Sequence, residues 1–261
     1  MQASRATSSF IFVLMATLLV VTAIASFAPT SLGLTIRVFS GQQLSPPPVV
    51  HFHAASMSTW LLLLLAQSVL VSKQRVDIHR KLGLASIVLA PCILVSMYGM
   101  DMYGVETFDA QASVVTSGVT PPEQIAQLKQ YASSILLIHG ASYLLFPGFY
   151  LWAILVRRRD NESHKRMMIL ATVVLMIPGL GRLLSITRVL PDFGLSIIDA
   201  RHFYLLLLLA PALVYDVVKL GAPDRSYVVG VVLLGAWMVA AHFLWASPWW
   251  VENSPKLLGI A

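Results

Sequence analysis

The chain has 261 residues, of which 57% are hydrophobic and only 11% are charged. Soluble globular domains carry roughly 25% charged residues, so this composition excludes an ordinary soluble domain and indicates an integral membrane protein. The formal net charge of +6 favours loops that face anionic lipid over nucleic acid as a partner, because no basic stretch is interleaved with aromatic residues. The single cysteine, Cys92, excludes an intramolecular disulfide.

Seven apolar runs predict seven transmembrane helices, because a chain in lipid must satisfy every backbone polar group internally. In chain order the runs are 10–28, 50–71, 82–100, 134–156, 167–186, 202–218 and 227–245. The expected fold class is all-α, a polytopic membrane helix bundle in a single domain over residues 1–261. The first run is either a retained helix or a cleaved signal peptide, since Arg5 precedes it and Ala23-Ile24-Ala25 resembles a cleavage site. Its length favours retention, and a six-helix bundle over 50–245 follows in either case.

Basic residues gather in alternate loops and set the expected orientation. The three basic loops contain Lys73, Arg75, Arg80 and Lys81, then Arg157, Arg158, Arg159, Lys165 and Arg166, then Lys219 and Arg225. By the positive-inside rule these loops face the cytoplasm, the N-terminus lies inside and the C-terminus lies outside. We therefore expect a multi-pass protein of a bacterial-type cytoplasmic membrane. Residues 101–130 are expected to form the longest outer loop and to end at Pro121-Pro122-Glu123, where a lead-in to the fourth helix starts.

Two halves of the chain share a pattern of histidines. His53 lies near the start of the second apolar run, and His79 follows about 26 residues later, just before the third. His139 lies near the start of the fourth run, and His164 follows about 25 residues later, just before the fifth. A basic-acidic loop precedes the second histidine in each half. The pattern indicates a parallel two-helix repeat, with chance resemblance or shared topology as the alternative.

The histidines are expected to lie at two depths. At about 1.5 Å per residue, His53 lies roughly 27 Å above the inner end of its helix, and His139, His202 and His242 fall in the same outer layer. Neutral imidazole commonly binds iron, copper and zinc, so His53, His139, His202 and His242 are candidate ligands of a haem or a transition metal. The alternative is that these histidines meet lipid headgroups at the interface. His79 and His164 form an inner pair, or lie solvated in charged loops.

Helical spacing predicts which faces point into the bundle. On the second helix one stripe contains His53, Met57, Trp60, Leu64 and Gln67, and on the fourth a stripe contains His139, Ser142, Tyr143, Phe146 and Tyr150. Arg182 follows Pro178-Gly179 on a helix that we expect to be broken there. Arg182 would bind a haem propionate or an anionic substrate, or else extend to headgroups. Asp216 is interpreted most simply as an interfacial residue near Lys219.

Two resemblances follow from these residues. The strings Asp77-Ile78-His79-Arg80-Lys81-Leu82-Gly83, His164-Lys165-Arg166-Met167-Met168, Ala171-Thr172 and Tyr215-Asp216 resemble an uncharacterised family of bacterial multi-helix membrane proteins. The layout of His53, His79, His139 and His164 on four consecutive helices is similar to the two-haem transmembrane cytochromes b. That resemblance implies an outer haem on His53 and His139 and an inner haem on His79 and His164. The sequence departs from that family because the inner pair precedes its apolar runs.

The leading functional hypothesis is haem b or transition-metal binding for electron transfer or terminal-oxidase biogenesis, with respiratory-chain components as partners. The histidine-arginine/lysine pattern is also similar to small membrane proteins that assist oxidase assembly. The sequence has no P-loop, nucleophile elbow or His-Glu-x-x-His motif, which disfavours a hydrolase or transferase. The alternative hypothesis is a non-redox membrane carrier or scaffold with interfacial histidines.

Overall fold

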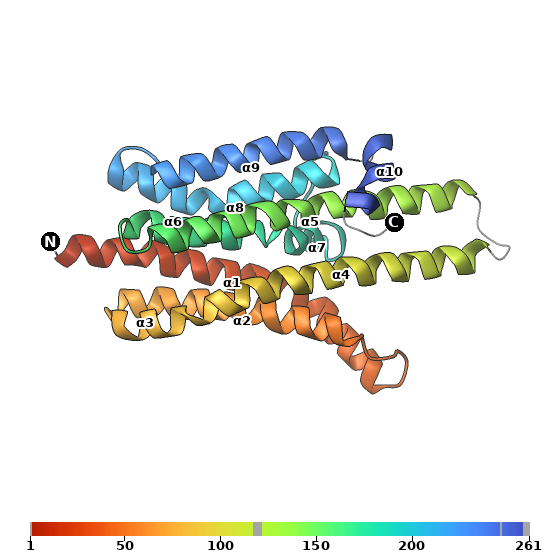
Figure 1. Ribbon diagram of the computed structural model, residues 1–261, viewed down its shortest axis with the longest axis horizontal. Helices are drawn as coiled ribbons and strands as arrows, with labels where there is room; N and C mark the ends of the chain where they lie inside the picture. The colour runs from red at the N-terminus through yellow and green to blue at the C-terminus, as the bar shows by residue number, and fades with distance from the viewer. Residues whose placement is uncertain (1, 117–121, 246, 258–261) are drawn as a thin grey trace.

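The computed structural model describes residues 2–116, 122–245 and 247–257, which form ten helices in an elongated bundle (Figure 1). The helices are α1 (Gln2–Phe39), α2 (Pro48–Ser72), α3 (Val76–Gly83), α4 (Ala85–Thr116), α5 (Pro122–Val156), α6 (Asn161–Val174), α7 (Ile177–Ser185), α8 (Ile197–Leu220), α9 (Arg225–Leu244) and α10 (Pro248–Leu257). Six spans are long and apolar enough to cross a membrane, and the bent pair α6–α7 makes a seventh. The prediction of an all-α polytopic membrane protein with about seven spans is confirmed.

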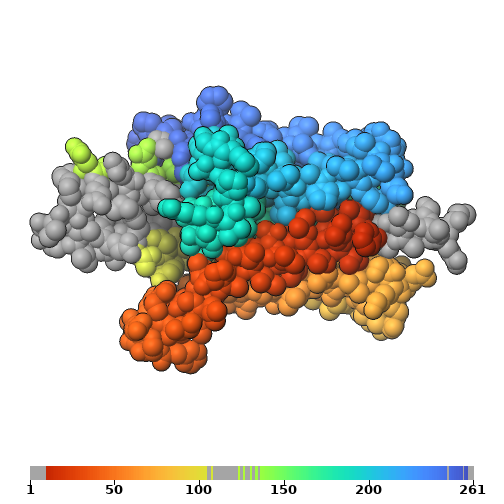
Figure 2. All heavy atoms as spheres, turned by 180° about the vertical axis from the view of Figure 1, so that it is seen from behind, coloured from red at the N-terminus to blue at the C-terminus, as the bar shows by residue number. Residues whose placement is uncertain are grey.

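The first apolar run is an integral part of this bundle. Helix α1 packs against α2 and against α6, α7 and α8, and the space-filling view shows α1 beside α7 and α8 (Figure 2). Met15, Ala16 and Leu19 of α1 are fully buried. Such packing is what a retained span would make, and retention in the mature protein stays a prediction.

The helices that carry the inner histidines begin earlier than the apolar runs indicate. We expected starts near Leu82 and Met167, with His79 and His164 in loops, and that expectation is wrong: α3 begins at Val76 and α6 at Asn161. The start of α6 is stabilised by Asp160, whose side chain accepts hydrogen bonds from the backbone N–H groups of Glu162 and Ser163. Hydropathy detects the segment inside lipid, whereas capping decides where the helix begins.

The outer connection between α4 and α5 also differs from expectation. Residues 101–116 continue α4 as helix, and α5 begins at the expected Pro122. A long loop over 101–130 is therefore wrong for the described residues, and 117–121 lie outside them. Figure 1 shows α4 and α5 extending beyond the other helices at this end. Polar residues lower hydropathy without ending a helix, which explains the error.

The expected break at Pro178 is confirmed. Helices α6 and α7 meet at 42°, with Pro178 in the first turn of α7. Proline lacks a backbone N–H and clashes with the carbonyl four residues before it, so a continuous helix is disfavoured there. The side chain of Arg201 packs closely against α7 at Gly181. A Cβ added at Gly181 would lie only 2.4 Å from Nε of Arg201.

A buried ion-pair network joins α6, α8 and α9. Arg166 donates from Nε and Nη2 to the two carboxylate oxygens of Asp216, at 2.9 and 2.8 Å. Arg166 also donates to Glu162, and Asp216 accepts from the backbone N–H of Asp224. Arg166 and Asp216 are 3% and 1% exposed. Asp216 is therefore a buried partner of Arg166, and its position at the membrane interface near Lys219 stays a prediction.

Candidate functional site

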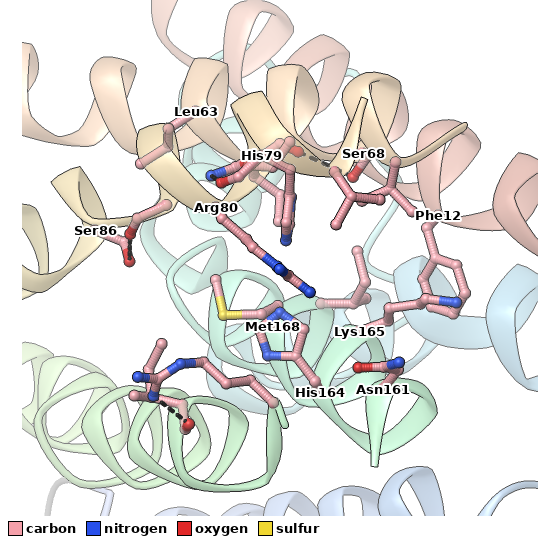
Figure 3. Close-up of a pocket in the computed structure, with 18 of the residues that line it drawn as sticks. Phe12, Leu63, Ser68, His79, Arg80, Ser86, Asn161, His164, Lys165 and Met168 are labelled. Carbon is pink, nitrogen blue, oxygen red and sulfur yellow. Dashed lines mark hydrogen bonds between the residues drawn. The ribbon is translucent and has the colours of Figure 1, made fainter. Parts of the chain in front are cut away.

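We call the end of the bundle that carries His79 and His164 the inner end, and the opposite end the outer end. At the inner end His79 of α3 and His164 of α6 point toward each other (Figure 3). Their ring centres are 6.4 Å apart and their ring planes cross at 82°. Both side chains line a cavity of about 1380 Å³ formed by residues of α2 to α6 and by Phe12 of α1.

Hydrogen bonds set the chemistry of the inner pair. Nδ1 of His164 lies 2.9 Å from the carbonyl oxygen of Ala153, which can only accept, so this nitrogen carries the proton. In a neutral ring Nε2 of His164 then presents a lone pair. Nδ1 of His79 is buried and has no hydrogen-bond partner among the described residues. The backbone carbonyl of His79 accepts from Nε2 of Gln67 at 3.1 Å, which holds α3 against α2.

The cavity has an apolar wall and a basic rim. The wall includes Trp60, Leu64, Ile87, Met168 and Ile169, and the rim includes Arg80, Arg157, Arg158, Arg159 and Lys165. Trp60 is fixed by a 3.1 Å hydrogen bond from Nε1 to Thr172 Oγ1 and by edge contacts with Phe146 and Tyr150. The predicted inward stripe of α2 is confirmed, because Trp60 and Leu64 are buried.

Near the rim, Asp160 carries a perturbed carboxyl group. A hydrogen bond from the hydroxyl of Ser163 lowers the pKa of Asp160 below its ordinary value, and the backbone N–H of Ser163 lowers this pKa further. The carboxylate therefore stays ionised at the start of α6. Its negative charge interacts favourably there with the positive end of the helix dipole. The result is a rigid first turn immediately before His164.

The outer pair consists of His53 on α2 and His139 on α5. Nδ1 of His53 lies 3.0 Å from Ser96 Oγ, whose own proton is donated to the carbonyl of Ile93 at 2.8 Å. Ser96 therefore accepts from His53, and Nε2 of a neutral His53 is left with a lone pair. Ser96 lies on α4 five residues before Asp101, which is the hydrogen-bond partner of His139. The two histidines of the outer pair are therefore both held by side chains of α4.

A buried carboxylate holds His139. Nδ1 of His139 is hydrogen-bonded to Oδ1 of Asp101, and the hydroxyl of Tyr143 donates to Oδ2 at 2.8 Å. Asp101 is only 4% exposed and comes from α4. Because both of its oxygens accept hydrogen bonds, Asp101 orients His139 in the way that a carboxylate orients a metal-binding histidine. The inward stripe of α5 is confirmed by the burial of Ser142 and Phe146.

The other two candidate metal ligands form a separate group around Asp199. Nδ1 of His242 lies 3.0 Å from Oδ1 of Asp199, which lies in the first turn of α8 after the capping residue Ser196. His202 is 1% exposed, and the charge of Asp199 acts on it as well. The expected outer layer of four histidines is thus divided into the pair His53–His139 and a group on α8 and α9.

Arg182 lies against α1. Its Nη1 donates to Thr30 Oγ1 at 3.3 Å, and its guanidinium carbon lies 4.8 Å from the centre of the Phe27 ring. A cation over an aromatic face is stabilised by the ring quadrupole. These two contacts with α1 explain why the Arg182 side chain lies where it does. Its role toward a propionate stays a prediction.

The sequence indicated the histidines of the inner and outer pairs but not the groups to which their rings are hydrogen-bonded. Ser96, the carbonyl of Ala153 and the pairing of Asp101 with His139 were missed. Residue 101 was expected to begin the outer loop, and no partner was expected for the carboxylate of Asp101. Among the residues that the structure describes, no three His, Cys, Asp or Glu side chains are close enough to share a metal ion. Comparison of the chain with protein-family models, curated proteins and solved structures gave no match.

Proposed function

We propose that the protein binds two haem groups, one at each histidine pair, and carries electrons across the membrane. The observation that carries the proposal is the geometry of His79 and His164. A nitrogen–metal bond is about 2.0 Å long and the ring centre lies about 1 Å beyond the nitrogen, so two imidazoles that held one metal ion would have ring centres within roughly 6 Å of each other. The ring centres of His79 and His164 are 6.4 Å apart.

Paired histidines suit haem iron better than a bare ion. Haem iron takes four ligands from its own macrocycle and needs only two from the protein, whereas a structural zinc site commonly takes four protein ligands. At about 1380 Å³, the inner cavity exceeds the roughly 300–1,000 Å³ of ordinary small-molecule pockets. Its apolar wall would contact the macrocycle, and Arg80 and Lys165 at the rim would bind the propionates.

The hydrogen bonds at the other nitrogen support ligation. Metal-binding histidines usually donate their second N–H to a carbonyl, a carboxylate or a similar acceptor. His164, His53 and His139 each have such an acceptor at Nδ1: Ala153, Ser96 and Asp101 respectively. The arrangement favours Nε2 as the ligating atom of all three. A bound haem would supply the one-electron chemistry. The chain would supply the ligands, orient them and surround the haem with a medium of low polarity.

The positions of the two sites support transfer across the bundle. Ala153, which holds His164, lies fourteen residues along α5 from His139. At 1.5 Å per residue this is about 21 Å, most of the roughly 30 Å hydrocarbon core of a bilayer. With the basic loops in the cytoplasm, the inner site faces the cytoplasm and the outer site the other side of a bacterial-type cytoplasmic membrane. Respiratory-chain components are the partners that fit this placement.

The test is a reduced-minus-oxidised absorption spectrum of the purified protein, with haem and metal content from the same sample. We expect two haems in the wild type and one after His79→Ala or His53→Ala. The matched control is His51→Ala, because His51 is exposed and Ser45, at 3.5 Å, is its one side-chain hydrogen-bond partner among the described residues. A protein that is colourless and metal-free under conditions that preserve a control cytochrome would contradict the proposal.

A non-redox carrier is the second candidate, and the bent α6–α7 pair favours it. Broken helices line the substrate sites of many transporters, with their half-helix ends directed at the substrate. The bend of 42° lies within a fully buried part of the bundle around Met176 and Ile177. A colourless protein that moves a solute in vesicles, and loses this activity on Pro178→Ala, would support the carrier.

A further inference from the structure

Three consecutive arginines follow the end of α5 and line the inner cavity: Arg157, Arg158 and Arg159. We call them the arginine triplet. All three side chains are exposed. Within the described parts of the chain the triplet takes part in no ion pair, unlike the neighbouring basic residues Lys165 and Arg166. Its positive charges are therefore available to an anion from outside the chain.

An apolar groove between α4 and α5 adjoins the triplet. The two helices are joined there by a 2.9 Å hydrogen bond between the hydroxyls of Ser86 and Tyr150. Leu84 and Ile87 flank Ser86 in the chain, and Ile154 lies one turn beyond Tyr150 on α5. All three apolar side chains line the cavity, yet Leu84 and Ile87 are 63% and 50% exposed. The groove is therefore accessible, and its surface suits an acyl chain.

Arg157 connects the triplet to the groove. Its Nη1 donates to the carbonyl oxygen of Ile154, one of the last four carbonyls of α5, which have no partner within the helix. This hydrogen bond holds the guanidinium beside Ile154, whose side chain belongs to the groove. Four of the five guanidinium N–H groups remain for other acceptors. A charged group next to an apolar groove is the arrangement that an anionic amphiphile requires.

We propose that the arginine triplet and the groove bind an anionic phospholipid, with the phosphate at the triplet and an acyl chain along Leu84, Ile87 and Ile154. The planar guanidinium fork matches two oxygens of a phosphate, so arginine suits such a head group. Basic pockets between membrane helices on the cytoplasmic side bind phospholipid head groups, and anionic lipids are abundant in that leaflet. In the expected orientation the triplet meets that leaflet.

The lipid site lies apart from the residues assigned to the propionates of a haem. Those residues, Arg80 and Lys165, come from α3 and α6, and Lys165 lies over the ring of Phe12. Figure 3 shows Ser86, which marks the groove, on the other side of the cavity from Phe12 and Lys165. The inference therefore goes beyond the proposed function, and its test needs no bound haem.

The experiment is native mass spectrometry of the purified protein, delipidated in a neutral detergent and titrated with dioleoylphosphatidylglycerol. We expect this lipid to fill a site that dioleoylphosphatidylcholine, which has no net charge, does not fill. In the triple variant Arg157→Gln, Arg158→Gln, Arg159→Gln the affinity for the glycerol lipid should fall by roughly tenfold or more, because each basic residue near an anionic head group contributes to binding. Equal binding of the two lipids by the wild type would overturn the inference.

The matched control is the triple variant Lys73→Gln, Arg75→Gln, Lys81→Gln. It removes three exposed positive charges from the same inner end, at residues outside the cavity lining. This variant should keep the wild-type affinity for dioleoylphosphatidylglycerol. Equal losses of affinity in the two triple variants would contradict a site at the triplet, because they would indicate attraction by the net charge of the whole surface.

Inorganic phosphate distinguishes a lipid from a free anion. We expect dioleoylphosphatidylglycerol to raise the unfolding temperature of the wild type, since a ligand that binds only the folded state stabilises it. Inorganic phosphate at the same concentration should not do so, because it has no acyl chain for the groove. An equal rise with inorganic phosphate would overturn the assignment to a lipid. The double variant Arg158→Gln, Arg159→Gln keeps the hydrogen bond of Arg157 and tests the site if the triple variant does not fold.

Discussion

Asp101 and Asp216 are both buried carboxylates in a membrane bundle, yet their partners give them different roles. Asp216 receives two hydrogen bonds from Arg166, in a fork that matches both carboxylate oxygens, and joins α8 to α6. Asp101 receives one hydrogen bond from His139 and one from Tyr143, across α4 and α5. The charge of Arg166 is permanent, whereas His139 keeps a second nitrogen free for a ligand. Both carboxylates are buried, but the partner of each suggests a different experiment: stability for Asp216 and the orientation of His139 for Asp101.

The largest expected effect is on the structural pair. Arg166→Ala leaves Asp216 buried and uncompensated, which costs about 3–5 kcal/mol. Thermal unfolding in detergent should show a large loss of stability. Arg158→Ala, at an exposed position of the same inner end, is the control and should change little. Equal stabilities of the two variants would contradict a structural role for the Arg166–Asp216 pair.

A smaller loss of stability is expected at the functional carboxylate. Asp101→Asn keeps the volume and an acceptor oxygen but removes the charge, and a hydrogen bond to a charged group contributes about 1.5–3 kcal/mol. The same unfolding assay should place this variant between wild type and Arg166→Ala. An Asp101→Asn variant that is less stable than Arg166→Ala would contradict this order of the two carboxylates.

Trp60→Phe sharpens the comparison with a neutral buried group. The change removes the hydrogen bond from Trp60 to Thr172 and leaves that hydroxyl with its donation to the Met168 carbonyl. We expect a loss of about 1 kcal/mol, because one neutral hydrogen bond contributes about that much. Trp152→Phe on the exposed face of α5 is the control. Haem content measured beside stability would show whether the cavity wall also affects binding.

The smallest effect belongs to an exposed carboxylate. Asp160→Ala removes the cap of α6 and is expected to cost about 1 kcal/mol near neutral pH. Because the folded-state pKa of Asp160 is lowered, chiefly by the hydroxyl of Ser163, this contribution is complete above the unfolded pKa and disappears as pH falls through the folded one. Unfolding measured over a pH series should show the gap closing in acid. Asp160→Ser keeps a cap without the charge, so its stability relative to Asp160→Ala should not depend on pH.

The sequence predicted the spans well because lipid imposes one simple rule on them. Runs such as 50–71 must be helical wherever they cross the membrane, and α2 covers this run. The break at Pro178 was predictable for a similar reason, since proline acts locally. The starts of α3 and α6 were missed because their first turns contain polar and charged residues, which an apolar run does not include. This error placed His79 and His164 in loops.

The partners of the histidines depend on contacts that no local pattern encodes. Asp101 and His139 are 38 residues apart, and His53 and Ser96 are 43 apart. Residue spacing along one helix predicted that His53 and His139 face inward, and burial of their stripes confirmed it. Which side chain meets each ring depends on the rotation of α4 between α2 and α5, so only the packed bundle shows it.

The length of α4 and α5 has a mechanical consequence. Both helices extend beyond the rest of the bundle at the outer end (Figure 1), and they also carry Asp101 and His139. The hydrogen bond between Asp101 and His139 therefore joins the two helices near the point where this extension meets the rest of the bundle. Any shift of α4 relative to α5 at this level changes the hydrogen bonds that Asp101 makes with His139 and Tyr143, and so the surroundings of His139.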